Sequence, residues 1–262
     1  MLGKLIKHEF KATSKTLGIL HIALFFTTIM GIIAIHLNKN DKYEFVSNLT
    51  LVLYILIMIA VAVAVMIYLV VRFYRNLFTD EGYLMNTLPI KPSALIFSKL
   101  FVSFVWTIIN FICTLFSILI LVLSQTSLSS ILTAWNALST DAWKELGISI
   151  HVLLFIGIIG GLVSIIYMFL MFYTSIAIGQ TMRNHKVLFS LGAYVVLYII
   201  SQVISAVGLV PFGFFALIQA DNFNIGTTFT PIMLSSYAIS IALIVIYFII
   251  TNYIVSKKLN LE

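Results

Sequence analysis

The residues best suited to chemistry or to binding lie in one polar segment, residues 72–99. Its charged side chains are Arg72, Arg75, Asp80, Glu81, Lys91 and Lys99, and it also contains Pro89 and Pro92. No nucleophile–base pair is visible in this segment or elsewhere, so an integral-membrane enzyme is the least favoured function. We interpret the segment as the main place where a water-soluble partner can bind the chain.

The sequence lacks the motifs that usually bind nucleotides or metal ions. The sequence contains no G-x-x-x-x-G-K-[ST] motif, so this chain cannot hold a nucleotide in that way. His8 and Glu9 are adjacent, but no second histidine follows His8 after four residues, as a zinc-binding helix requires. The histidines at 21, 36 and 151 are dispersed, which argues against a metal centre or a proton relay. We expect no cofactor in this chain, and energy for any directed transport must come from another polypeptide.

The composition identifies the environment of the chain. Of its 262 residues, 61% are hydrophobic and 9% are charged, whereas a soluble domain has about 45–50% apolar and about 25% charged residues. This predicts an all-α polytopic membrane protein with a single transmembrane domain over residues 1–262. The single cysteine, Cys113, excludes an intramolecular disulfide.

Six apolar stretches can each cross a bilayer as a helix. They lie at about 16–38, 46–71, 100–123, 148–178, 187–210 and 232–255. We expect the first to be a retained span, because it lacks the cleavage pattern of a signal peptide. Twelve of the 15 Lys and Arg residues lie on one side of this arrangement, which predicts cytoplasmic termini by the positive-inside rule. Between 124 and 145 we expect a longer loop in which Thr140 caps a short helix.

Residues 1–15 form an amphipathic pattern. Leu2, Leu5, Ile6 and Phe10 share one helical face, and the opposite face carries Lys4, Lys7, Lys11 and Lys15. Such a helix lies along an anionic membrane surface, and each lysine contributes roughly 1 kcal/mol there. A basic flank that only orients the first span explains the same residues, and the two interpretations are compatible.

The predicted spans contain no Asp, Glu, Lys or Arg, which argues against ion pumps and proton-coupled transporters. They do contain polar and aromatic stripes at helical spacing. The residues that we single out are Trp106, Asn110, Thr114, Tyr194, Tyr198 and Gln202. These stripes predict either hydrogen bonding between helices or the lining of a path for an amphipathic substrate. The small-residue patterns Gly157-x-x-x-Gly161 and Ala60-x-x-x-Ala64 predict places where helices approach closely.

Two segments are similar to one protein family. The stretch LFTDEGYLMNTLPIKPSALIFSKL and the opening MLGKLIKHEFKATSKT resemble the permease subunits of type-two ATP-binding-cassette exporters of Gram-positive bacteria. The resemblance implies six spans, an opening interfacial helix, and a segment between spans five and six (here 211–231) that folds back at the outer face. It also implies a cytoplasmic coupling helix within residues 73–99. Its ATPase-coupling residues here are Thr79, Asp80, Glu81, Gly82, Tyr83, Leu84, Met85 and Leu88.

The residues of that loop agree with a short helix. Thr79 or Asp80 can begin it, Pro89 ends it, and Pro92 suits the start of the helix that continues into span three. The family further implies two permease copies, identical or related, joined to two ATPase subunits that hold ATP and Mg²⁺.

The expected function is therefore that of a permease subunit in a bacterial cell membrane, for export of an amphipathic or hydrophobic peptide, bacteriocin, toxin, lipid or drug. The alternative is a membrane sensor or scaffold that works with an ATPase and does not transport. We expect the lipid bilayer as a further partner and no nucleic acid. A secondary transporter is disfavoured by the uncharged spans.

Overall fold

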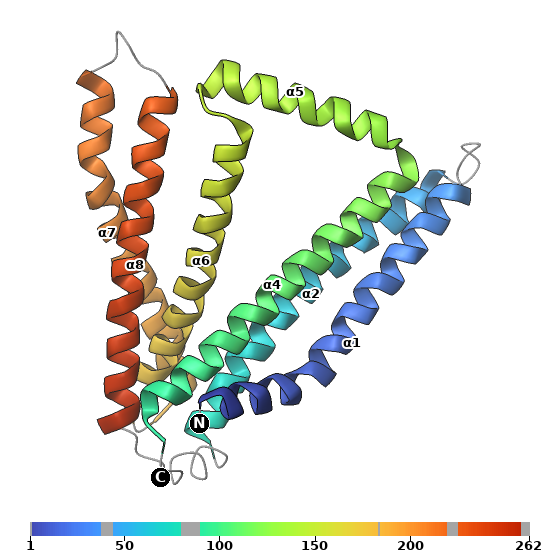
Figure 1. Ribbon diagram of the computed structural model, residues 1–262. Coiled ribbons are helices and arrows are strands. Elements are labelled where there is room, and N and C mark those ends of the chain that lie inside the picture. The colour runs from blue at the N-terminus through green and yellow to red at the C-terminus, as the bar shows by residue number, and fades with distance from the viewer. Residues whose placement is uncertain (1, 38–43, 80–89, 183, 219–224, 258–262) are drawn as a thin grey trace. The chain divides into compact units, whose positions relative to one another are not determined.

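The computed structural model describes residues 2–37, 44–79, 90–182, 184–218 and 225–257, and every regular element within these ranges is a helix (Figure 1). The helices are α1 (Leu2–Leu37), α2 (Glu44–Phe78), α4 (Pro92–Gln125), α5 (Leu128–Leu146), α6 (Ile150–Gly179), α7 (Lys186–Ile218) and α8 (Ile225–Lys257). The predicted all-α class is confirmed for this part of the chain.

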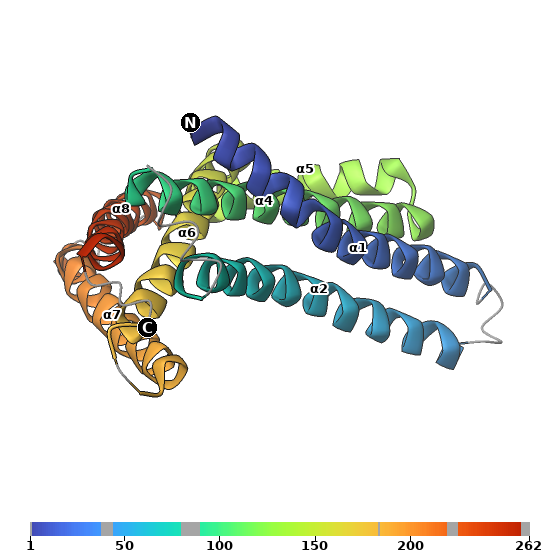
Figure 2. The same ribbon diagram turned by 90° about the horizontal axis from the view of Figure 1, so that it is seen from below.

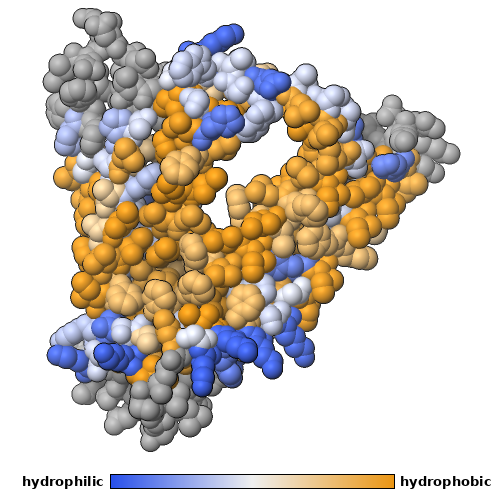
Figure 3. Space-filling view, viewed as in Figure 1, coloured by the Kyte–Doolittle hydropathy of each residue, from blue (hydrophilic) through white to orange (hydrophobic). Residues whose placement is uncertain are grey.

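Six of these helices, all except α5, are long and apolar enough to cross a membrane. The shortest, α6, has 30 residues, which at ~1.5 Å per residue is about 45 Å and exceeds the ~30 Å hydrocarbon core. Figure 3 shows hydrophobic residues over the middle of the helices and hydrophilic residues near their ends. The chain is therefore a multi-pass membrane protein whose helices extend beyond the hydrocarbon core.

The chain forms two compact units, one from Met1–Arg72 and Phe97–Thr133 and the other from Phe73–Ile96 and Ala134–Glu262. In the first unit α1, α2 and α4 lie side by side (Figures 1 and 2). α4 begins at Pro92 as predicted, because the fixed φ and missing N–H of proline are compatible with the first position of a helix.

In the second unit α6 packs against both α7 and α8, and α7 packs against α8. Tyr237 on α8 donates a hydrogen bond to the carbonyl of Ile156 on α6, with 2.9 Å between the oxygens. The rings of Phe73 and Tyr173 stack with their centroids 3.6 Å apart, and both side chains are fully buried. Aromatic packing and single interhelical hydrogen bonds hold this unit together.

Close helix approach occurs at other glycines than the sequence pattern predicts. A Cβ built on Gly157 or Gly161 meets nothing within 4 Å, and both residues are exposed. A Cβ on Gly160 would lie 2.6 Å from the ring of Tyr237, and one on Gly179 would lie 2.6 Å from the backbone nitrogen of Ser190. The prediction for Gly157-x-x-x-Gly161 is therefore wrong for contacts within the described chain, since the glycine that faces α8 lies between them.

The segment predicted as a loop between 124 and 145 is largely the helix α5. Ser127 precedes α5 and accepts a hydrogen bond from the backbone N–H of Ser130, as an N-cap residue does. Thr140 does not cap a short helix, because it lies within α5 and its hydroxyl bonds back to the carbonyls of Asn136 and Ala137. Leu128, Leu132 and Trp135 recur at helical spacing, which is the signal for this helix in the sequence.

The predicted opening helix and first span form one unbroken helix, α1. In Figure 1 its first turns lie at an angle to the remainder. Thr13 and Ser14 bond back to the carbonyls of Glu9, Phe10 and Lys11 at this point, and such back-bonding bends helices. Between spans five and six, α7 continues through Pro211 to Ile218 and α8 begins at Ile225 before Pro231. Residues 219–224 lie outside the described ranges, so the fold-back at the outer face stays a prediction.

Candidate functional site

The most strongly polar site in the first unit is an ion cluster of Glu9, Arg72 and Lys99, which we call the Glu9 cluster. Glu9 Oε2 accepts a hydrogen bond from Arg72 Nε at 2.8 Å, and Glu9 Oε1 accepts one from Lys99 Nζ at 2.7 Å. The side chains of Glu9 and Lys99 are each 4% exposed, and that of Arg72 is 22% exposed. One carboxylate therefore joins three helices, because the residues come from α1, α2 and α4.

The buried stripe of α1 explains why Glu9 points inward. The buried residues of α1 are Glu9, Thr13, Leu17, His21, Leu24, Thr28, Gly31 and Ala34, spaced three or four apart. Residues with this spacing share one helical face. The membrane-surface candidates Lys4, Lys7, Lys11 and Lys15 lie off this stripe and are exposed, which fits the face predicted for them.

Two cations, Arg72 and Lys99, bind the single carboxylate of Glu9. Ions removed from water lose several kcal/mol of hydration each, and close opposite charges offset that loss only with good hydrogen-bond geometry. The two separate bonds to Glu9 provide that geometry, because each oxygen serves a different cation. The arrangement fixes the N-terminal part of α1 against the end of α2 and the beginning of α4.

Trp106, predicted either to form hydrogen bonds between helices or to line a substrate path, packs beside the Glu9 cluster. Its indole Nε1 donates to Thr13 Oγ1 at 2.8 Å, and its ring stacks on Phe10 with centroids 5.0 Å apart. Trp106 is 7% exposed. Its side chain is thus used to hold α4 against α1.

A second polar junction joins the same helices nearer their other ends. Thr28 Oγ1 donates to its own helix at Leu24 O, so Ser117 donates to Thr28 and Tyr54 donates to Ser117. The O···O distances are 2.6 Å and 2.7 Å. Because Glu9 meets Lys99 and Thr28 meets Ser117, α1 and α4 run parallel, and α2 runs antiparallel to both.

We predict that Ser117→Ala weakens this junction measurably. The change removes both interhelical hydrogen bonds of Ser117, which is fully buried, and such bonds contribute about 0.6 kcal/mol each on average. Thermal unfolding in detergent should show a loss of roughly 1 kcal/mol. Thr114→Val, one turn earlier on α4, is the matched control, because Thr114 makes no hydrogen bond among the described residues; an equal loss in both variants would contradict the prediction.

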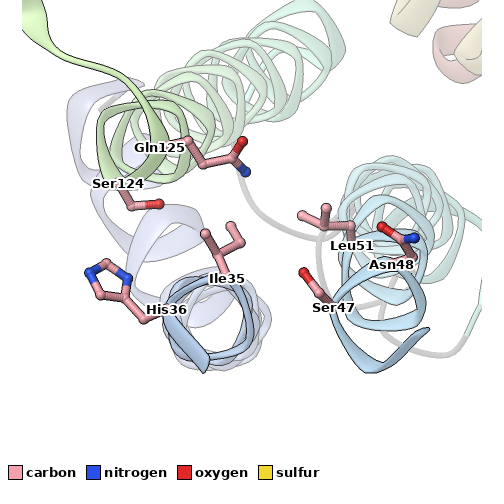
Figure 4. Close-up of a pocket in the computed structure, with 7 residues that line it drawn as sticks. All are labelled: Ile35, His36, Ser47, Asn48, Leu51, Ser124 and Gln125. Carbon is pink, nitrogen blue, oxygen red and sulfur yellow. The ribbon is translucent and has the colours of Figure 1, made fainter. Parts of the chain in front are cut away.

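A cavity of about 380 Å³ opens beyond this junction, between α1, the beginning of α2 and the end of α4. Figure 4 shows its lining side chains, which include no Asp, Glu, Lys or Arg: Ile35, His36, Ser47, Asn48, Leu51, Ser124 and Gln125. The His36 ring bonds back to Ile32 O, and Ser124 bonds back to Leu121 O. The packing of the three helices therefore ends in a cavity that is lined partly by polar side chains.

The remaining path candidates are divided between the units. In the first unit Asn110 is buried and Thr114 is half-buried on α4. In the second unit Tyr194 stacks on Phe172 at 4.8 Å, and its centroid lies 6.5 Å from that of Tyr198 on the same face of α7. Tyr198 and Gln202 are exposed. The hydroxyl of Tyr247 on α8 meets α7 at two atoms, the hydroxyl of Ser201 and the carbonyl oxygen of Leu197.

The predicted ATPase-coupling residues fall almost wholly outside the described ranges, and Thr79 alone is described. Thr79 follows the last residue of α2 and donates to Arg75 O at 2.6 Å. Asp80, Glu81, Gly82, Tyr83, Leu84, Met85 and Leu88 are not described. The structure does define the two helix ends that border this loop, Phe78 and Pro92.

Glu9 is the site residue that sequence reasoning missed. It lies three positions after Ile6 and four after Leu5, and so on the apolar face of the opening helix. A carboxylate on an otherwise apolar helical face is the sequence feature that could have pointed to a buried ion pair. No group of three or more His, Cys, Asp or Glu residues in the described part of the chain could hold a metal ion. In comparisons with known proteins, no family model, curated protein or solved structure matches this chain.

Proposed function

We propose that this chain is the permease subunit of an ATP-driven exporter, located in a bacterial cell membrane with both termini in the cytoplasm. It acts with a second permease copy, identical or related, and with two ATP-binding-cassette ATPase subunits that hold ATP and Mg²⁺. The cargo is an amphipathic or hydrophobic molecule, such as a peptide, bacteriocin, toxin, lipid or drug.

The observation that carries the proposal is the Glu9 cluster. The coupling loop lies between α2 and α4, and Arg72 and Lys99 are on the portions of these helices next to it. Glu9 binds both residues. A displacement of the loop by the ATPase therefore passes to α1 through two charge-assisted hydrogen bonds, as well as to α2 and α4 through the backbone. Such a connection gives a partner protein control over three helices at once.

The interior chemistry supports the class of cargo. The described middle portions of the helices offer hydroxyl, amide and aromatic groups. Apart from Lys11 and Lys15 on the exposed face of α1, the charged residues with described burial lie near helix ends or in α5. Uncharged polar and aromatic side chains suit amphipathic molecules better than small ions, which need charged or carbonyl ligands. The lysine face of α1 rests on the anionic inner leaflet in this arrangement.

The test is a double change in the coupling loop, Glu81→Ala with Tyr83→Ala. The permease is reconstituted in vesicles with a candidate ATP-binding-cassette ATPase, and hydrophobic peptides are screened for stimulation of ATP hydrolysis and for transport. We expect stimulation to fall about 5-fold or more, the range of a lost coupling between sites. Asp141→Ala with Trp143→Ala is the matched control, because it removes an exposed acid and an exposed aromatic ring from α5.

Unchanged export by the Glu81/Tyr83 variant contradicts the proposal. ATPase binding and stimulation without any transport of cargo into vesicles favours the alternative of a sensor or scaffold subunit.

A further inference from the structure

The helix α5 is almost wholly exposed, although it carries several large apolar side chains. Of its residues from 128 to 144, only Ile131, Ser139 and Ala142 are half-buried, and none is buried. Leu128 and Leu138 are 64% and 59% exposed. Helices in proteins owe most of their stability to the packing of an apolar face, so the contact that covers this face comes from outside the described residues.

The apolar side chains of α5 share one side of the helix, which we call the α5 apolar face. They recur every three or four residues, and they are Leu128, Ile131, Leu132, Trp135 and Leu138. Ser139 lies among them, and its hydroxyl donates to the carbonyl of Asn136. The opposite face carries Ser129, Ser130, Thr133, Thr140 and Lys144. Among the described helices α5 is not one of the six that are long and apolar enough to cross a membrane, and its two-sided pattern is that of a helix at a surface.

A contact to the next helix shows which way the α5 apolar face points. The ring of Trp135 lies 6.4 Å from that of His151, centroid to centroid, and His151 is in the first turn of α6. Between the two helices Gly147 has a φ of 63°, and its N–H donates to the carbonyl of Trp143 at 3.0 Å. A glycine in this conformation after a helix lets the chain turn back. The beginning of α6 therefore lies on the Trp135 side of α5, and because α6 is a candidate span, the apolar face points toward the membrane.

Both ends of α5 are held at the membrane surface by short connections. Residues 126–127 join it to the end of α4, and residues 147–149 join it to the beginning of α6 (Figure 1). A chain extends by at most about 3.6 Å per residue, so neither end of α5 can lie far from the end of a span. The adjoining ends of these spans also expose apolar side chains, since Leu123 on α4 is 40% exposed and Phe155 on α6 is 65% exposed. The lipid that covers the spans therefore reaches α5.

We propose that α5 is an interfacial helix whose apolar face binds the lipid at this surface of the bilayer. Such a helix lies in the plane of the membrane, with its apolar side buried about 5–10 Å into the boundary between headgroups and acyl chains. Tryptophan is enriched at this boundary, which suits Trp135, and the polar face with Thr133 and Thr140 then lies in water. The occupant is lipid because the face begins and ends beside membrane-spanning helices.

The attraction between α5 and lipid is apolar. The segment 128–146 contains one lysine and two acids, so anionic headgroups do not attract it. This distinguishes α5 from the N-terminal part of α1, which exposes four lysines. The inference needs only the two spans that flank α5, so it holds for either orientation of the chain and is independent of the proposed function.

The test places nitroxide labels on the full chain in phosphatidylcholine vesicles. Cys113→Ala removes the single cysteine, and each label is then attached to one new cysteine. The apolar face is labelled through Leu132→Cys or Leu138→Cys, and the polar face through Thr133→Cys or Thr140→Cys. All four side chains are exposed, so the labels leave the packing of the described residues intact.

We expect dissolved oxygen, which concentrates in lipid, to relax the labels at positions 132 and 138 more strongly than a water-soluble nickel chelate does. We expect the reverse at positions 133 and 140. The labels on the apolar face should lie about 5–10 Å below the headgroup phosphates, and addition of phosphatidylglycerol should leave this depth unchanged. Circular dichroism checks that each variant keeps its helix content.

Labels at positions 132 and 138 that the nickel chelate reaches as readily as those at 133 and 140 overturn the proposal, because both faces would then lie in water. Labels on the apolar face that neither reagent reaches also overturn it, since a protein surface, such as a second copy of the chain, would then cover that face. A lipid contact that forms only with phosphatidylglycerol contradicts apolar binding.

Discussion

Glu9→Leu is expected to lower the free energy of unfolding by about 3–5 kcal/mol, the cost of breaking a buried ion cluster by removing one partner. The change leaves Arg72 and Lys99, which bind the same carboxylate, as neighbouring like charges in a region poor in water. The loss corresponds to roughly 10²–10³-fold or more in the unfolding equilibrium, since about 1.4 kcal/mol is tenfold. Unfolding by SDS titration in mixed micelles measures it directly.

The three members of the Glu9 cluster should not be equivalent. Arg72→Leu removes the more exposed cation and keeps the buried Glu9–Lys99 ion pair, so it should cost less than Glu9→Leu. Lys11→Leu removes an exposed charge from the same helix and should change stability by no more than about 0.5 kcal/mol. Replacing Glu9, Arg72 and Lys99 together by methionine should restore most of the loss, because apolar packing often matches a buried ion cluster in stability.

Equal stability of the wild type and Glu9→Leu would show that the cluster does not hold α1 in place. The proposed coupling through α1 would then lose its structural basis. The same Glu9→Leu protein, if it folds, should also show weaker coupling of ATP hydrolysis to cargo. The methionine triple variant separates the two effects, since it restores packing but not the charge-assisted bonds.

The helices were predictable because their signals are local. A long uncharged apolar stretch and a proline at the start of a helix can each be recognised within one segment of the sequence. The six long helices and the start of α4 at Pro92 follow from these signals. α5 was missed although its apolar residues recur at helical spacing. The sequence predicts Thr140 as the start of a helix, but a threonine hydroxyl can also bond back to a carbonyl within a helix. The sequence around Thr140 does not decide between the two.

The polar contacts between helices were much harder to predict, because they depend on which faces meet. The spacing of Trp106 and Asn110 shows that they share a face of α4, but not that α1 covers that face. Glu9 could have been noticed as a carboxylate on an apolar face. Its two partners lie 63 and 90 residues away in the sequence, and no local pattern selects them. The spacing of the path candidates Tyr194, Tyr198 and Gln202 likewise shows that they share a face of α7, but not which helix covers that face.

Gly179→Ala is expected to destabilise the second unit by about 3 kcal/mol, the upper part of the usual range for overpacking. Gly179 is the last residue of α6, and an added Cβ would lie 2.6 Å from the backbone nitrogen and 2.7 Å from the Cα of Ser190 on α7. Backbone atoms of a helix cannot rotate away as the end of a side chain can. The helices must therefore separate, and this also disturbs the bond from Ser190 Oγ to Lys186 O.

Gly157→Ala in the same helix is the matched control, because the new Cβ meets nothing within 4 Å. Alanine has a higher helix propensity than glycine by about 1 kcal/mol, so this variant should be as stable as the wild type or slightly more stable. SDS titration of both variants, with circular dichroism to check helix content, gives the comparison. A Gly179→Ala protein that unfolds at the wild-type SDS concentration would show that α6 and α7 do not meet at Ser190. The contrast is informative because the sequence pattern singles out Gly157, whereas the packing of α7 makes Gly179 the residue that must lack a side chain.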